Sequence, residues 1–137
     1  MLLFSKKTRP VSIAIIVSLF ADLFISNGLL KFLFARPRPC AIETGVTMLQ
    51  ACPTSFSFPS GHTAASFASV TALWLAGKRQ WAMAALPLAV LIAFSRMYLC
   101  VHFPTDILGG AVLGTACGWL GAWSIKKLEE RRTVRPR

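Results

Sequence analysis

The sequence contains few charged residues and very few acidic ones. Only 15% of its 137 residues are charged, whereas 55% are hydrophobic, so there are too few polar side chains to cover a water-soluble globule. Five acidic residues also leave little material for a carboxylate-rich metal site. We find no repeats, linkers or second domain, and therefore expect residues 1–137 to form one membrane-embedded domain.

Long apolar runs take the place of the missing polar residues. They cover residues 11–30, 61–77, 81–101 and 107–125, each close to the roughly 20 residues that a helix needs to cross a bilayer. Helices are expected because lipid leaves no backbone polar group unpaired. The sequence thus predicts an all-α, polytopic bundle of four transmembrane helices. Its predicted parts are helices at about 11–35, 60–77, 81–101 and 104–125, an outer loop at 36–59 and a basic cytoplasmic tail at 126–137.

The net charge of +10 comes from basic clusters before the first predicted helix, between the second and third, and after the fourth. The clusters consist of Lys6, Lys7, Arg9, Lys78, Arg79, Lys126, Lys127, Arg131, Arg132, Arg135 and Arg137. All of them fall on one side of the membrane if the helices alternate in direction, and the positive-inside rule makes that side cytoplasmic. This placement favours topology over nucleic-acid binding. A cleaved signal peptide is disfavoured because the first apolar run continues past a typical signal core without a convincing cleavage site.

Three short motifs carry the chemistry. They are Lys31-x6-Arg38-Pro39, Pro59-Ser60-Gly61-His62 and Ser95-Arg96-x5-His102-x3-Asp106. Taken singly, each is more typical of a helix start, a helix stop or a snorkelling side chain. In the predicted topology, however, all three lie at the extracytoplasmic ends of the helices, where charged residues near a membrane core are usually functional.

The residue types predict phosphoryl transfer. A neutral His102 can attack phosphorus, with Asp106 holding its other ring nitrogen, and His62 can protonate the leaving oxygen. The predicted phosphate ligands are the cations Lys31, Arg38 and Arg96 together with the helix start at Ser60 and Gly61.

These motifs resemble the three signatures of the type 2 phosphatidic acid phosphatase superfamily, over Asn27 to Gly110. The resemblance implies His102 as nucleophile, Asp106 as its partner, His62 as acid, the same phosphate ligands, and no metal or other cofactor. Membrane members usually have six spanning helices, with the signature beginning at the third, whereas here it begins at the first. A minimal form, a fragment and an assembly with another subunit remain open.

We therefore expect an integral phosphatase of the cytoplasmic (inner) membrane that acts on a lipid phosphate or pyrophosphate at the outer face. Undecaprenyl pyrophosphate is favoured; phosphatidylglycerophosphate, phosphatidic acid and lipid A phosphate are alternatives. Outside the enzyme class, the alternative is a non-catalytic membrane subunit with a relic anion site. Spanning helices disfavour a soluble acid phosphatase or a vanadate-dependent oxidase.

Three further expectations concern the remaining residues. Cys40 and Cys52 lie together in the outer loop on the oxidising side, which makes them candidates for a disulfide. Gly110, Gly114 and Gly118 let another helix approach closely, either within the chain or in a homo-oligomer formed through the fourth helix. Asp22 and Asn27 are expected to face protein rather than lipid.

Overall fold

The structure is a computed structural model that describes residues 8–43 and 49–133 of the chain. Within these residues it contains helices and loops and no strands, so the all-α prediction is confirmed. The elements are α1 (Arg9–Ile25), η1 (Ser26–Leu30), α2 (Lys31–Phe34), α3 (Pro39–Ile42), α4 (Gly61–Leu75), α5 (Arg79–Tyr98) and α6 (Pro104–Thr133).

The first rod of the bundle consists of α1, η1 and α2, which follow one another without a break. Its middle part, η1, is a π-helix, in which the backbone N–H of Lys31 bonds to the carbonyl of Ser26, five residues back. The rod ends at Ala35, which has a left-handed φ of 41°. Helical continuation is blocked there because Pro37 and Pro39 restrict the residues before them.

Among the described residues, three segments are long and apolar enough to cross a membrane. They are Arg9–Ile42, which contains the first rod, Arg79–Tyr98, which is α5, and Pro104–Arg131, which is most of α6. The remaining predicted span, the second along the sequence, corresponds to α4, which has 15 residues and would cover about 22 Å at 1.5 Å per residue. This is less than the roughly 30 Å of a hydrocarbon core. It is short because it starts at Gly61, two residues after Pro59, and ends before Gly77, which has a φ of +74°.

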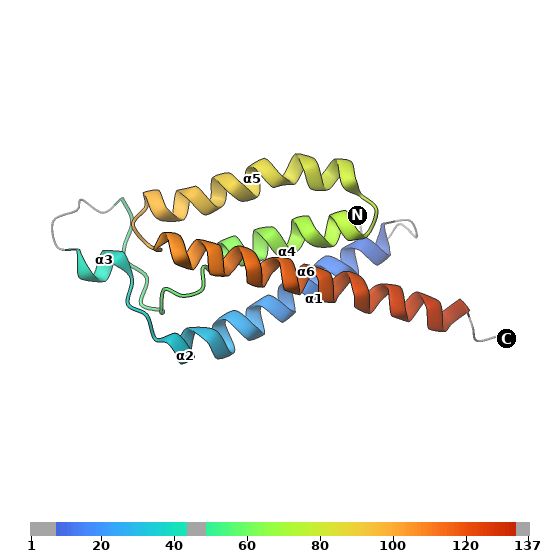
Figure 1. The fold of residues 1–137 in the computed structure, drawn as a ribbon, viewed down its shortest axis with the longest axis horizontal. Coiled ribbons are helices and arrows are strands. Elements are labelled where there is room, and N and C mark those ends of the chain that lie inside the picture. The colour runs from blue at the N-terminus through green and yellow to red at the C-terminus, as the bar shows by residue number, and fades with distance from the viewer. Residues whose placement is uncertain (1–7, 44–48, 134–137) are drawn as a thin grey trace.

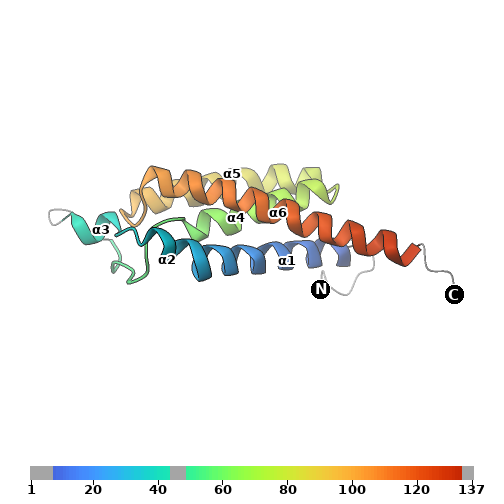
Figure 2. The same ribbon diagram turned by 60° about the horizontal axis from the view of Figure 1, so that its bottom comes forward.

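The short helix α4 is the centre of the bundle and contacts α1, α5 and α6. Figure 2 shows α1 and α5 on opposite sides of the bundle, with α4 and α6 between them. The buried face of α4 consists of small residues, including Ala64, Ala68 and Ala72. Small residues allow helix backbones to approach closely where lipid supplies no hydrophobic driving force.

The glycine row of α6 packs against this face of α4. A Cβ added at Gly110 would come within 2.6 Å of the carbonyl oxygen of Ser60, and one at Gly118 within 2.6 Å of that of Ala68. At Gly114 an added Cβ would collide with the backbone of Ala64. The row is therefore used inside the chain, and a homo-oligomer formed through α6 would have to use another face.

The two ends of the bundle differ in character. The start of α1, the α4–α5 turn and the end of α6 lie at one end, whereas α2, α3 and the α5–α6 turn lie at the other (Figure 1). The first end carries the basic residues Arg9, Lys78, Arg79, Lys126, Lys127 and Arg131. The other end carries the three sequence motifs.

Two boundaries differ from the prediction. Helix α6 continues through the predicted tail to Thr133, because Lys126, Lys127, Glu129 and Glu130 are good helix formers with opposite charges three and four residues apart. The predicted outer loop contains one short helix, α3. Residues 44–48 of that loop, and Lys6, Lys7, Arg135 and Arg137 of the basic clusters, lie outside the described residues.

Candidate active site

A cavity of about 720 Å³ lies at the motif end of the bundle. Its lining includes most of the residues predicted from the sequence motifs: Lys31, Arg38, Gly61, His62, Arg96 and His102. Asp22 and Asn27 also line it. Side chains from α1, α4, α5 and the connecting segments thus meet around one space that is large enough for a phosphate group and part of its leaving group.

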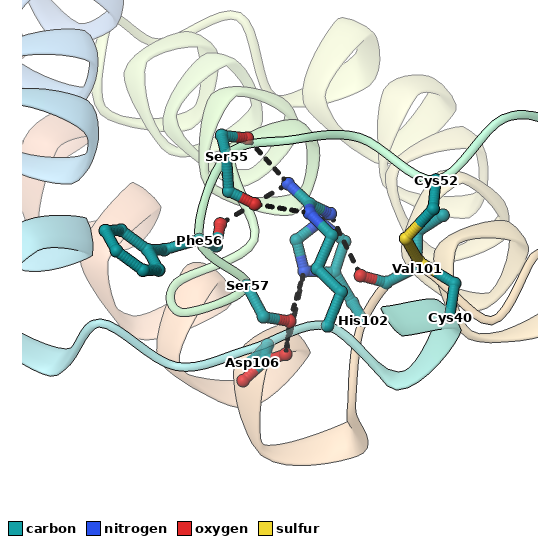
Figure 3. The surroundings of a disulfide bond; sticks show 9 residues. Cys40, Cys52, Ser55, Phe56, Ser57, Val101, His102 and Asp106 are labelled. Atoms are coloured by element: carbon teal, nitrogen blue, oxygen red, sulfur yellow. Dashed lines mark hydrogen bonds and ion pairs between the residues drawn. A yellow bond between two sulfur atoms is a disulfide. The ribbon is translucent and has the colours of Figure 1, made fainter. Parts of the chain in front are cut away.

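His102 lies in the α5–α6 turn and is only 4% exposed. Its Nδ1 is 3.6 Å from Oδ2 of Asp106, which is one helical turn on and fully buried. Ser57 joins the pair: its Oγ is 3.4 Å from Nδ1 of His102 and donates a short hydrogen bond to Oδ2 of Asp106. The loop segment with Ser55, Phe56 and Ser57 passes directly beside both residues (Figure 3).

The other ring nitrogen of His102 faces Arg38. Nε2 is 3.1 Å from Nη1 of Arg38, and because a guanidinium can only donate, Nε2 must accept. The neutral imidazole therefore carries its proton on Nδ1, toward Ser57 and Asp106. This leaves the lone pair of His102 on Nε2, the nitrogen next to the cationic side chain.

Arg38 is held by contacts to all its N–H groups. Besides His102, its guanidinium donates to the carbonyl of Val101 at 2.9 Å and to the carbonyl of Ser55 at 2.7 Å. It also donates to Oγ of Ser55 at 3.0 Å and to the carbonyl of Phe56 at 3.3 Å. These contacts fix the cation beside Nε2 of His102 before any ligand binds.

Burial lowers the pKa of His102 to about 4, and the positive charge of Arg38 acts in the same direction. The carboxylate of Asp106 opposes the shift. His102 is consequently neutral at physiological pH, which is the form that has a lone pair for attack on an electrophile.

Asp106 has a cationic partner that the sequence motifs do not include. Nη1 of Arg36 lies 2.9 Å from Oδ1 of Asp106 and also donates to Oγ1 of Thr105 at 2.6 Å. The guanidinium of Arg36 stacks on the ring of Phe103, 4.0 Å from its centroid, and the backbone N–H of Phe103 donates to Oδ2 of Asp106. The buried carboxylate is thereby compensated on both oxygens.

The start of α4 contributes backbone rather than side-chain groups. No side chain caps this helix end, and Gly61 and His62 line the cavity, so first-turn N–H groups are available for an anion. Ser60 itself is fully buried and is absent from the cavity lining. Its N–H donates to the carbonyl of Asp106 at 3.0 Å, and its Oγ accepts from Thr63.

Cys40 and Cys52 form a disulfide in the structure, and Figure 3 shows it at the edge of the site. The backbone N–H of Cys40 also donates to the carbonyl of Cys100 at 3.0 Å. Together these bonds connect the segment that carries Arg38 to the loop that carries its acceptors and to the α5–α6 turn.

Motif reading did not single out Ser55, Ser57 or the partner role of Arg36. The role of Arg36 could have been predicted from its position two residues before Arg38. Asp106 is the only carboxylate in the three motifs, so it was the obvious partner for an additional arginine there. The two serines gave no comparable signal, because short polar residues are common in loops for local reasons.

The family profile described as "PAP2 superfamily" matches residues 11–130 of the chain, a range that contains every residue of the site. The chain belongs to the PAP2 superfamily. The resemblance inferred from the three motifs to the type 2 phosphatidic acid phosphatases is thus confirmed.

Several PAP2 relatives are named for lipid substrates. The chain is 32% identical over 136 residues to an undecaprenyl-diphosphatase of Sulfolobus acidocaldarius, covering 95% of this chain and 65% of the relative. It is 38% identical over 107 residues to the putative undecaprenyl-diphosphatase YbjG of Escherichia coli, covering 77% and 52%. The chain therefore spans about half to two thirds of the length of these curated relatives.

Solved PAP2 structures have the same fold. LpxE of Aquifex aeolicus superposes with a TM-score of 0.66 at 33% identity, over 87% of this chain and 69% of that one. The phosphatidylglycerolphosphate phosphatase of Bacillus subtilis gives 0.66 at 30% identity, over 95% and 64%. With its apolar helices, this PAP2 chain is a multi-pass membrane protein.

Proposed function

We propose that this chain hydrolyses the terminal phosphate of a membrane lipid phosphate or diphosphate, using His102 as a covalent nucleophile. The observation that carries the proposal is the orientation of His102. Its Nδ1 side faces Asp106, whereas Nε2 lies beside Arg38 at the wall of a cavity that also contains Lys31 and Arg96. A neutral imidazole with one oriented ring nitrogen and a cationic surround suits attack on a phosphoryl group.

The proposed reaction has two steps. In the first, Nε2 of His102 bonds to phosphorus as the bond to the leaving oxygen breaks, and His62 donates a proton to that oxygen. Asp106 stabilises the imidazolium that forms. In the second, water attacks phosphorus and gives a proton to His62, the phosphorus–nitrogen bond breaks, and both histidines return to their starting states.

The cations around the cavity have an electrostatic role. Lys31, Arg38 and Arg96 stabilise the negative charge on the phosphoryl oxygens, and the N–H groups at the start of α4 add their dipoles. Metal independence is part of the proposal, since the groups that surround the cavity already supply the positive charge that a metal ion would otherwise provide.

Undecaprenyl diphosphate is the first substrate to test, because two relatives that match over most of this chain carry that name. Phosphatidylglycerophosphate and lipid A phosphates are the next candidates, since other relatives are a phosphatidylglycerophosphatase B of Bacillus subtilis and a lipid A 4′-phosphatase of Bacteroides thetaiotaomicron. Phosphatidic acid completes the panel.

The deciding experiment measures phosphate release by purified protein from this panel, with and without a chelator and with added vanadate. We expect turnover of at least one lipid phosphate, unchanged by the chelator and inhibited by vanadate, which mimics the five-coordinate transition state. Activity that disappears with chelation and returns with a divalent cation would contradict the metal-independent mechanism. No release from any lipid would favour the non-catalytic subunit.

Orientation is a separate part of the proposal. We place the basic end of the bundle in the cytoplasm, in accordance with the positive-inside rule. Both termini then lie inside, and the active site lies at the outer face of the cytoplasmic membrane. In this arrangement α4 is a fourth, short membrane crossing. Glu43 at the motif end and Gln80 at the basic end are both exposed. In a background with Cys100→Ser and Cys117→Ala, Glu43→Cys should react with an impermeant maleimide in intact cells and Gln80→Cys only after lysis. The reverse pattern would refute the orientation.

A further inference from the structure

Asp22 is an acidic residue in a cavity otherwise lined by cations. Among the described residues that line the cavity, it is the only acidic one, whereas the cations Lys31, Arg38 and Arg96 line the same cavity. It is only 5% exposed, and its Oδ1 has no hydrogen-bond partner within the described part of the chain. A carboxyl group inside a membrane-spanning rod is costly to keep and points to a function.

The π-helix η1 brings Lys31 toward Asp22. At about 100° per residue, nine residues of regular α-helix would place Lys31 on the opposite side of the rod from Asp22. The wider π-turn, in which Lys31 bonds back to Ser26, absorbs one extra residue and reduces this angle to roughly 80°. Helical side chains also lean toward the N-terminus, so that of Lys31 points back along the rod.

The two residues interact electrostatically. The positive charge of Arg38 and the negative charge of Asp22 act on Lys31 in opposite directions, and Lys31 is the charged partner of Asp22. Any anion that binds Lys31 therefore competes with a carboxylate that is built into the protein.

We propose that Asp22 is a positioning residue that competes with phosphate for Lys31 and so keeps the affinity of the site for free phosphate low. The inference rests on the proposed function, in which inorganic phosphate is the second product and has to leave a pocket of three cations. Without the carboxylate, the same pocket would retain phosphate and slow each turnover.

The expected size follows from the coupling between Asp22 and Lys31 that a bound phosphate has to overcome. Charged residues in one interacting network couple by roughly twofold to a hundredfold in an equilibrium constant, and we take about tenfold as the expected change. Neutralising Asp22 should therefore tighten phosphate binding by about this factor. A gain in affinity is a specific sign, because a variant that merely disturbs the fold would bind phosphate more weakly.

The test measures the dissociation constants of inorganic phosphate and vanadate by ligand-induced thermal stabilisation of the purified protein, which requires no turnover. We expect Asp22→Asn to lower both constants about tenfold and Asp22→Glu to retain the wild-type values. Ser26→Ala, a change at another buried polar residue of the same rod, is the matched control and should leave both constants unchanged. Asp22→Ala provides a second neutral variant if Asn does not fold.

A double-mutant cycle tests the route through Lys31. In a Lys31→Gln background, Asp22→Asn should change phosphate affinity by less than about threefold. Unchanged or weaker binding in both Asp22→Asn and Asp22→Ala would overturn the inference, and so would a full tenfold effect without Lys31. Failure of the proposed function looks different: the wild-type protein would release phosphate from no lipid, whatever the binding constants are.

Discussion

The acidity of His102 provides the sharpest test of the site geometry. Its pKa lies near 4 rather than 6.5, first because of burial and second because of Arg38. Replacing Arg38 by Gln removes the second cause and leaves the first, so the pKa should rise from about 4 toward 6.5 without reaching it. Arg38→Lys keeps the charge and should leave the pKa of His102 near 4.

The direction of the effect on activity follows from the protonation state. A pKa of about 4 means that His102 gains its proton only below that pH, so the acid limb of kcat/KM that belongs to the nucleophile lies there. At pH 5 about nine-tenths of His102 is then neutral, compared with about 3% if the pKa were 6.5. Undoing the whole shift would therefore reduce the reactive fraction at pH 5 about thirtyfold.

The assay benefits from a chain with only two histidines. Titration of ¹⁵N-histidine-labelled protein in nanodiscs should give two imidazole signals, which His62→Gln assigns. Arg96→Gln is the control, because Arg96 lines the cavity but is not among the charges that shift the pKa of His102. A His102 that titrates between pH 6 and 7 in the wild type would refute the reasoning, as would one that does not respond to Arg38→Gln.

Three further predictions concern the nucleophile, its hydrogen bonds and the bundle. His102→Ala should abolish turnover of every substrate. His62→Ala should reduce the hydrolysis rate of an alkyl phosphate by about 10² to 10⁴ but spare an activated aryl phosphate, whose leaving group needs no proton. Equal rate losses for both substrates in His62→Ala would mean that the roles are misassigned. Ser57→Ala should lower kcat about tenfold with little change in KM, because it removes the hydroxyl between the imidazole and its carboxylate; a change in KM alone would argue for substrate contact instead. Gly114→Ala should destabilise the bundle by about 1–3 kcal/mol in a denaturant titration, whereas Gly28→Ala, with no atom closer than 4.0 Å to the added Cβ, should stay close to wild type.

The sequence predicted which residues meet but not how each one is used. Helices that alternate in direction bring Lys31, His62 and Arg96 to one end of the bundle. This placement depends only on where each residue lies along its helix, so it can be predicted without knowing the side-chain conformations. The spacing of four residues also predicted the contact between His102 and Asp106, although His102 precedes α6 and approaches Asp106 from the α5–α6 turn. Family membership could be predicted because the three motifs consist of these residues at fixed spacings in the sequence.

The missed contacts depend on loop paths and helix rotation. Ser57 reaches Asp106 only because the loop turns back across the start of α6, which no local pattern encodes. Ser60 stands at the predicted helix start, but its N–H faces α6 rather than the cavity because the glycine row draws the two helices together. The π-turn at η1 is likewise invisible to a count of residues, although it decides on which side of the rod Lys31 lies.

The hydrogen bonding of Arg38 has a consequence for the chemical reactivity of the resting protein. All of its N–H donors are engaged, so a phosphate oxygen can bind it only by replacing an existing acceptor. Ser55, Val101 and His102, which all accept from Arg38, line the cavity. Of these acceptors, Nε2 of His102 is the one whose lone pair the proposed reaction needs, and in the free protein the guanidinium covers it. We expect it to be slow to react with alkylating or acylating reagents until an anion draws Arg38 away. Under the proposed mechanism, the phosphate group that His102 attacks is also the ligand that exposes its Nε2. The imidazole is then protected from other electrophiles between turnovers.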